Sequence, residues 1–227
     1  MPAPSITVDQ YYIDGNFDLF VGTLANGLST PTVITVSSSG VTALGATAMT
    51  VAATSDQLYE GQRIRFGSQD VYLTADAASG ATSLSIRALV AEVADATDGI
   101  TYAMKPVYAI EEVSFTKTDQ TLEVNTSDSP SFGTEELKLY QTVTRNCMCF
   151  DILNSGNLGL ETLKVAGDAT GKAANIYYEL IESDNSGEFG LALIKDFKRE
   201  TLSKDKEKKY SFTLRCQGSP TKLVKPA

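Results

Sequence analysis

Short alternations of apolar and polar residues run through most of the chain. The clearest is KKYSFTLRC at residues 208–216, where every second residue from Tyr210 to Cys216 is apolar. A period of two residues is typical of a half-buried β-strand. NIYYELIE at 175–182 and FGLALIKDF at 189–197 precede it, and the turn-forming sequence SDNSG separates these two. We therefore expect three consecutive strands in this part of the chain.

A single stretch departs from this period. Residues 147–153 have the character of a strand end, and Ser155-Gly156 then interrupts the apolar run. From Leu158 to Val165 the apolar residues recur at a spacing close to that of a helix, and Gly167 is suited to end it. The pattern predicts one short helix inside an otherwise all-β chain.

Two longer strands are expected before this helix, at residues 107–125 and 137–153, joined by the polar loop TSDSPSFGTEE. Together they predict an extended hairpin. On the second strand the apolar positions are odd-numbered at first and even-numbered from Met148 onward. Such a change of phase predicts either a β-bulge or a strand that passes from one sheet into another.

Residues 37–102 differ from the rest of the chain in composition, because small residues dominate and aromatic residues are few. We expect this segment to form a small β domain on the outer surface. It would be inserted into a larger domain made of residues 1–36 and 103–227. The predicted fold class is mainly β, a β-sandwich or barrel of two packed antiparallel sheets with one flanking short helix and a long hairpin.

The inserted segment contains a weak internal repeat, GATAMTV at 45–51 and GATSLSI at 80–86. Between the two copies, apolar and polar residues alternate on either side of Gly67-Ser68, which is a natural hairpin turn. Two copies are too few for a solenoid. They predict a small module built from two similar hairpins.

Overall charge and missing residue types narrow the possible functions. The 227-residue chain has a net charge of −9 and contains neither histidine nor tryptophan. Such a negative net charge argues against a protein that binds nucleic acid tightly, because the phosphates bind mainly to cationic side chains. Without histidine, Ser-His-Asp and Cys-His nucleophile systems and His-containing zinc sites are excluded. We expect no enzymatic activity and no cofactor.

The cysteines suggest packing rather than chemistry. Cys147-x-Cys149 resembles a metal motif, but only Cys216 and carboxylates remain as further ligands, so small buried hydrophobes are the better interpretation. Three cysteines do not make a disulfide framework and suit synthesis in a reducing cytoplasm. No apolar run reaches membrane-spanning length, so no membrane partner is expected.

Charged residues follow two patterns. Carboxylates are spread along the predicted strands, and paired carboxylates for sugar hydrolysis are one interpretation. A collective negative surface is favoured, because no tryptophan is present to stack against a sugar. Residues 195–209 are the exception, with seven cations and four acids. We expect a basic loop there, either solvated or in contact with an acidic patch on another copy of the chain.

The stretch from Phe150 to Gly167 resembles the tail tube, or major tail, proteins of tailed bacteriophages. In that family a strand ends in an F-x-[LIV] run, and a short helix with a pattern near N-L-x-L-x-L-x-G follows. The matching residues here are Phe150-Asp151-Ile152, then Asn157 to Leu163, then Gly167. The order of the long hairpin before this stretch and of the strands after it is also similar. The resemblance covers about half of the chain. The insert departs from the basic family pattern.

The resemblance implies a structural virion protein, made in the bacterial host cytoplasm and located in the virion tail. Its subunits would form hexameric rings that stack into a tube, through which genomic DNA is ejected without specific binding. Implied partners are further copies of the chain and other tail proteins, namely terminator, tape measure, and baseplate, or a sheath in a contractile tail. The main alternative is a β-sandwich module of a phage tail or cell surface that binds a receptor or a glycan.

Three groups of residues are predicted to act in such an assembly. An acidic lumen would let DNA slide, because it repels phosphates. The acids expected to face it are Glu111, Glu123, Glu179 and Glu182. The expected ring-stacking tip of the long hairpin comprises Thr126, Asp128, Ser131, Phe132 and Glu135. The expected basic inter-subunit loop contains Lys198, Arg199, Lys204 and Lys206.

Overall fold

The computed structural model describes residues 6–12, 17–24, 30–108, 110–125, 134–151, 157–200 and 208–223. Within these ranges, side chains are described except at 6–12, 111–112, 120–125, 134–141, 150–151 and 200. The described chain is mainly β, with one α-helix and packed antiparallel sheets that do not close into a barrel. This confirms the predicted fold class in its sandwich form.

A nine-stranded sheet carries the main domain, and every strand pair in it is antiparallel. In spatial order its strands are β1 (Ile6–Tyr12), β10 (Ile110–Asn125), β11 (Thr134–Asp151), β14 (Lys208–Cys216), β13 (Gly187–Glu200), β12 (Asn175–Glu182), β2 (Phe17–Thr23) and β9 (Lys105–Val107), while β15 (Thr221–Leu223) pairs with β13.

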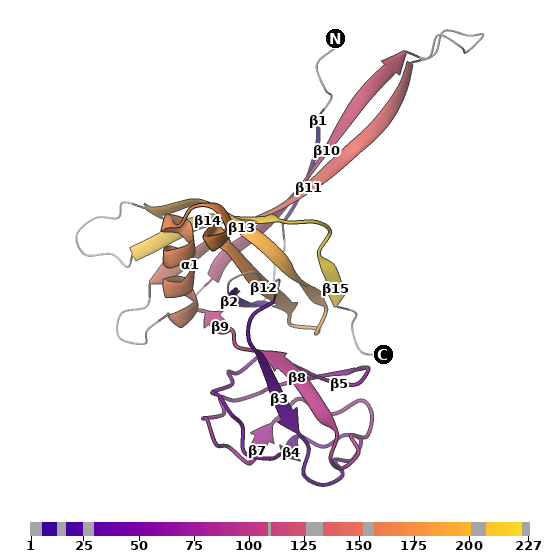
Figure 1. Cartoon of the computed structure of the whole chain (residues 1–227), viewed down its shortest axis with the longest axis vertical. Coiled ribbons are helices and arrows are strands. Elements are labelled where there is room, and N and C mark those ends of the chain that lie inside the picture. The colour runs from indigo at the N-terminus through magenta and orange to yellow at the C-terminus, as the bar shows by residue number, and fades with distance from the viewer. Residues whose placement is uncertain are drawn as a thin grey trace.

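One hydrophobic core lies between this sheet and the helix (Figure 1). Strand β14 contributes its alternate residues from Tyr210 to Cys216, all of them buried, which confirms the period of two. Cys147 and Cys149 on β11 are also buried in this core as thiols rather than as a disulfide. Their interpretation as small hydrophobes is therefore confirmed.

Helix α1 (Leu158–Asp168) begins and ends close to where the sequence predicts. The Asn157 side chain caps it by accepting a hydrogen bond from the backbone N–H of Leu160 at 3.2 Å. Leu160, Leu163 and Ala166 form its buried stripe. A short 3₁₀ turn, η1 (Gly171–Ala174), then leads into β12.

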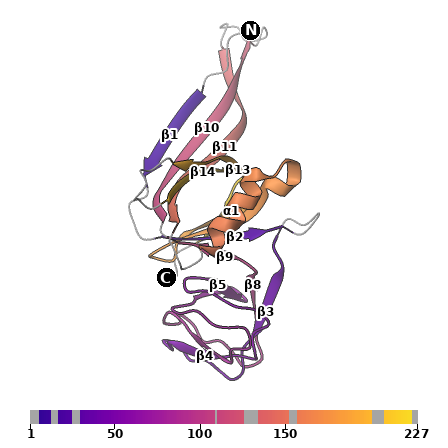
Figure 2. The ribbon, with the colours of Figure 1, turned by 90° about the vertical axis from the view of Figure 1, so that its left-hand side faces the viewer.

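Strands β10 and β11 form the predicted long hairpin, which projects from the main domain at the end opposite the insert (Figures 1 and 2). The pairing slips by one residue where Gln120 faces Tyr140 and Thr121 faces Lys138, so a bulge lies near position 139. The predicted change of phase at Met148 is wrong. Buried positions stay odd-numbered from Val143 to Cys149, because the two cysteines pack as apolar residues.

The insert forms its own sheets around a separate core. Its larger sheet has the order β3 (Val33–Ser37), β8 (Asp98–Tyr102), β5 (Arg63–Phe66) and β6 (Gln69–Tyr72), and its smaller sheet pairs β4 (Ala48–Thr50) with β7 (Ser83–Ser85). The predicted boundary at residue 37 is a few residues late, because β3 pairs along its whole length with β8. The expected turn at Gly67-Ser68 joins β5 to β6, with Gly67 at φ 59°.

The internal repeat proves to be a pseudo-twofold symmetry of the whole insert. Residues 35 positions apart, such as Gly45 and Gly80, occupy equivalent places, and both glycines have positive φ. Strand β3 corresponds to β6, and β8 corresponds to β5. The pseudo-twofold axis passes between Met49 and Leu84, which are paired across β4 and β7. Isolated bridges repeat in the same way. The bridge between Ser38 and Val51 corresponds to the one between Leu73 and Ile86. The bridge between Thr42 and Val93 corresponds to the one between Ala77 and Leu58.

Candidate assembly surfaces

Strand β12 is covered on both of its faces. Ile176, Tyr178 and Leu180 point into the core of the main domain. Tyr177 and Ile181 point the other way, into a second cluster shared with residues of the insert and of β2. The sequence NIYYELIE already carries this signal, because a strand without alternation is typical of one buried on both faces. The insert therefore packs as a second layer on the main sheet.

Glu179 lies on the face of β12 that the insert covers. Its Oε1 accepts a hydrogen bond from Nη2 of Arg63 on β5 at 2.7 Å, and the two side chains are 1% and 6% exposed. Nη1 of Arg63 lies 3.0 Å from Asp70, so one guanidinium bridges two carboxylates. The prediction that Glu179 faces a lumen is wrong, because the insert buries this carboxylate against Arg63.

Burial and pairing act in opposite senses on these two groups. Burial raises the pKa of the Glu179 carboxyl, and the adjacent Arg63 guanidinium opposes that rise. Burial by itself lowers the pKa of Arg63, but the charges of Glu179 and Asp70 outweigh it and raise that pKa. Because a buried ion is tolerated only with a partner, the pair ties the insert to β12.

A second buried charge pair lies at the base of the long hairpin. Nη2 of Arg145 on β11 is 2.5 Å from Glu188 on β13, and its guanidinium stacks 3.9 Å from the ring centroid of Phe115. The Tyr178 hydroxyl donates to the other oxygen of Glu188 at 2.9 Å. These contacts fix the direction in which the hairpin leaves the main domain. They border a pocket of about 240 Å³ beside Lys222.

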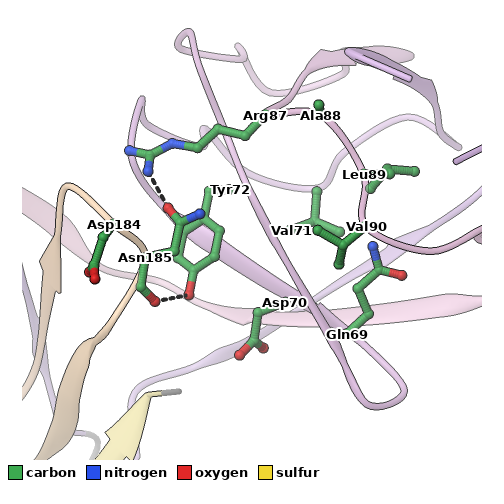
Figure 3. Close-up of a pocket in the computed structure, with 10 residues that line it drawn as sticks. All are labelled: Gln69, Asp70, Val71, Tyr72, Arg87, Ala88, Leu89, Val90, Asp184 and Asn185. Atoms are coloured by element: carbon green, nitrogen blue, oxygen red, sulfur yellow. Dashed lines mark hydrogen bonds between the residues drawn. The ribbon is translucent and has the colours of Figure 1, made fainter. Parts of the chain in front are cut away.

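The close-up in Figure 3 shows a smaller pocket, of about 160 Å³, between the insert and the turn that joins β12 to β13. The Tyr72 hydroxyl donates to the backbone oxygen of Asn185 at 3.1 Å, and Arg87 donates to the Asn185 side chain. Asp70, which also lines this pocket, forms an ion pair with Arg63. Asp184, on the other wall, accepts hydrogen bonds from the backbone N–H and the hydroxyl of Ser186. Of these contacts, those of Tyr72 and Arg87 with Asn185 are the ones that cross the seam between the two domains.

The long hairpin presents an edge without a partner strand among the described residues. Pairing of β11 with β14 begins at Thr144, so the stretch from Thr134 to Val143 pairs only with β10. Strand β1 pairs with β10 no further than Gln120, so the described hairpin beyond that point is two-stranded. A two-stranded ribbon in water is marginally stable, which makes this the region that most needs a partner.

The other predicted site residues are distributed as follows. Glu182 is half-buried at the end of β12 and accepts from the Ser186 hydroxyl at 3.2 Å. Lys198 and Arg199 belong to β13 and are exposed, so the expected loop begins later than predicted. The remaining predicted residues cannot be placed on a surface. Thr126, Asp128, Ser131, Phe132, Lys204 and Lys206 lie outside the described residues, and the side chains of Glu111, Glu123 and Glu135 are not described.

These features define the chain as a mainly β protein with two packed domains and a projecting hairpin, one edge of which has no partner among the described strands. No protein-family model matches the chain, and no curated protein is significantly similar to it in sequence. Within the described ranges, no helix is long and apolar enough to span a membrane, and no three potential metal ligands of the His, Cys, Asp or Glu type gather.

Proposed function

We propose that the chain is a structural subunit that assembles with copies of itself into stacked, hexameric rings forming a phage tail tube. The observation that carries this proposal is the long hairpin, whose β11 edge pairs with no described strand before Thr144. A monomer gains nothing from holding such a ribbon away from its core, because backbone groups at an open edge invite pairing with another chain.

The positions of the open edges support the proposal of a ring. The outermost strand β1 and the outer part of β11 both face away from other described strands of the sheet. If the β11 edge of one copy meets the β1 edge of the next, the contact is heterologous, and repetition around an axis closes a ring. The ring number of six comes from the family resemblance.

The acidic composition supports a conduit for DNA. Six copies with a net charge of −9 repel phosphates, so DNA can slide without specific binding. Of the acids first expected in the lumen, Glu111, Glu123 and Glu182 remain part of the proposal, and Glu179 does not. The other tail proteins and the virion tail location belong to the same proposal.

Electron microscopy of the purified protein tests the proposal. Negative-stain images of the wild-type chain are expected to contain rings or tubes. A shortened variant, in which an Asn-Gly turn replaces residues 121–139, removes the two-stranded ribbon and the predicted stacking tip. It is expected to be monomeric, with a β-type circular dichroism spectrum and cooperative unfolding that show a folded main domain. A wild-type chain that stays monomeric at high concentration, or a shortened variant that assembles normally, would overturn the proposal.

A further inference from the structure

The main sheet divides into two arms at the residue pair Thr144 and Arg215. From this pair onward β11 lies beside β14, whereas the earlier part of β11 has no described partner on that side. The chain that follows Arg215 stays with β13, because the backbone N–H of Gln217 donates to the carbonyl of Leu191 at 2.8 Å and β15 then pairs with β13. Figure 1 shows the hairpin and β15 leaving the main domain in different directions. Two open strand edges, one of β11 and one of β15, therefore border a wedge.

The pocket of about 240 Å³ beside Lys222 lies where the two arms part. Phe115 and Arg145 line it from the hairpin, Glu188 lines it from β13, and Lys222 lines it from β15. Leu180 on β12 adds to its apolar wall. The wedge thus has open backbone edges on both sides and a pocket with apolar and charged walls at its base.

The guanidinium of Arg145 has one donor without an acceptor among the described atoms. Its Nη1 and Nη2 donate to the carbonyl of Thr144 and to Glu188, but its buried Nε makes no hydrogen bond. Glu188 already accepts from Arg145, from the Tyr178 hydroxyl and from Lys222. Buried polar groups in native proteins nearly always have a partner. An acceptor is therefore what this pocket lacks.

Charge indicates which acceptor fits. The Lys222 ammonium is 3.3 Å from Glu188 and its side chain is 73% exposed, so it can contact a second acceptor. Glu182, the other carboxylate of the lining, accepts from the Ser186 hydroxyl at 3.2 Å. A carboxylate that enters beside Arg145 and Lys222 would meet two cations, and an apolar group beside it would meet Phe115.

Strand β1 carries both of these groups, and its outer edge pairs with no described strand. The register sets Tyr11 opposite Phe115 and Phe115 opposite Arg145, so these three positions lie on one face of the sheet. Asp9 is two residues before Tyr11 and lies on the same face. When β1 continues the sheet next to β11, its Asp9 and Tyr11 positions lie on the side of the pocket.

The β1 strand of the same chain cannot supply this contact. Strands β10 and β11 lie between β1 and the wedge, and each step from strand to strand spans about 4.8 Å. The contact therefore forms between two molecules. It joins different surfaces of the two copies, so it can repeat around a ring.

We infer that β1 of a second copy pairs with the open edge of β11 and enters the wedge beside β15. The second copy's Asp9 accepts from Arg145 and Lys222, and its Tyr11 packs against the apolar wall of the pocket. This inference rests on the proposed ring, for which it names the partner strand, its binding site and the residues that join them.

Asp9→Asn tests the charged contact by sedimentation velocity over a concentration series. Self-association is expected to weaken at least about tenfold, because the charge that faces Arg145 and Lys222 is lost. The matched control is Asp56→Asn, which neutralises an exposed acid of the insert and is expected to associate like the wild type. Equal association of Asp9→Asn and the wild type would overturn the inference.

A disulfide cross-link tests the position of β1 in the wedge. An Asp9→Cys protein and a Lys222→Cys protein are mixed and oxidised, and a cross-linked dimer is expected on a non-reducing gel from the mixture but from neither protein alone. The native cysteines are buried, so they do not compete. Lys172→Cys, at an exposed position of η1, replaces Lys222→Cys in the control mixture and is expected to give no cross-linked dimer.

Electron micrographs of the same mixtures separate this inference from the ring proposal. Rings in a mixture that gives no cross-link between positions 9 and 222 would overturn the inference and leave the ring proposal standing. The cross-link in a mixture that forms only open chains or dimers would overturn the closed ring and leave the inference standing.

Discussion

Arg63 and Glu179 are 116 positions apart in the sequence, yet their side chains meet at 2.7 Å and are almost wholly buried. Arg63 comes from the insert and Glu179 from β12, an interior strand of the main sheet. The pair therefore makes the insert a fixed layer of the molecule rather than a loosely tethered appendage.

Breaking this pair is expected to be costly. Arg63→Met leaves the Glu179 carboxylate buried without its partner, which is expected to lower the free energy of unfolding by about 3–5 kcal/mol. The double variant Arg63→Met with Glu179→Leu is expected to recover most of that loss. Guanidinium unfolding followed by circular dichroism measures both.

An exposed ion pair is the control for this experiment. Glu161 and Lys164 on α1 are 66% and 26% exposed, so Glu161→Gln is expected to cost less than about 1 kcal/mol. If Arg63→Met cost no more than Glu161→Gln, the buried pair would not be what holds the insert in place.

Alkaline pH is expected to destabilise the fold. Burial raises the pKa of Tyr72 to about 12, and it also raises the pKa values of Tyr177 and Tyr178. The folded state then keeps protons that the unfolded state releases above about pH 10, so stability falls as pH rises. The slope is up to about 1.4 kcal/mol per pH unit for each tyrosine.

Unfolding curves between neutral pH and pH 12 measure this slope. Tyr72→Phe is expected to make the decline shallower between pH 10 and pH 12, because one titrating group is gone. A decline of the same steepness in this variant would show that Tyr72 does not titrate with unfolding.

The three thiols are expected to be unreactive in the folded protein. Cys147, Cys149 and Cys216 are buried, and burial raises the pKa values of Cys147 and Cys216, which lowers their thiolate fractions. A thiol-specific chromogenic reagent is expected to modify none of them in native buffer and all three in guanidinium. Rapid labelling under native conditions would contradict their placement in the core.

Packing of α1 on β9 is expected to depend on Gly159. A Cβ at this position would lie 2.5 Å from the backbone oxygen of Pro106, so Gly159→Ala is expected to cost about 1–3 kcal/mol. Gly190→Ala is the matched control, because its nearest neighbour, Pro220 Cα, is 3.7 Å away. Equal thermal midpoints for the two variants would argue against close packing of the helix.

Local patterns predicted the local elements. The run from Leu158 to Val165 identifies α1 because helical spacing is a property of neighbouring residues. The alternation in 208–216 identifies β14 for the same reason. The composition of the insert and its echo at Gly45 and Gly80 indicate a separate, repeated module.

Predictions about which face is covered succeeded less often. On β11 the cysteines belong to the apolar face, and counting only the larger hydrophobes shifted that face by one residue. Strand β3 belongs to the insert through its pairing with β8, whose residues lie 61 to 69 positions later. The apolar residues around Glu179 indicate a strand covered on both faces, but its partner Arg63 lies 116 positions away in the sequence.

By itself, the sequence determined the secondary structure, the mainly β class and the presence of an insert, because these depend on short-range spacing and composition. Only the tertiary structure decided that the insert covers β12 and that Arg63 neutralises Glu179. Burial of a side chain depends on what packs over it, and here that partner comes from a distant part of the chain.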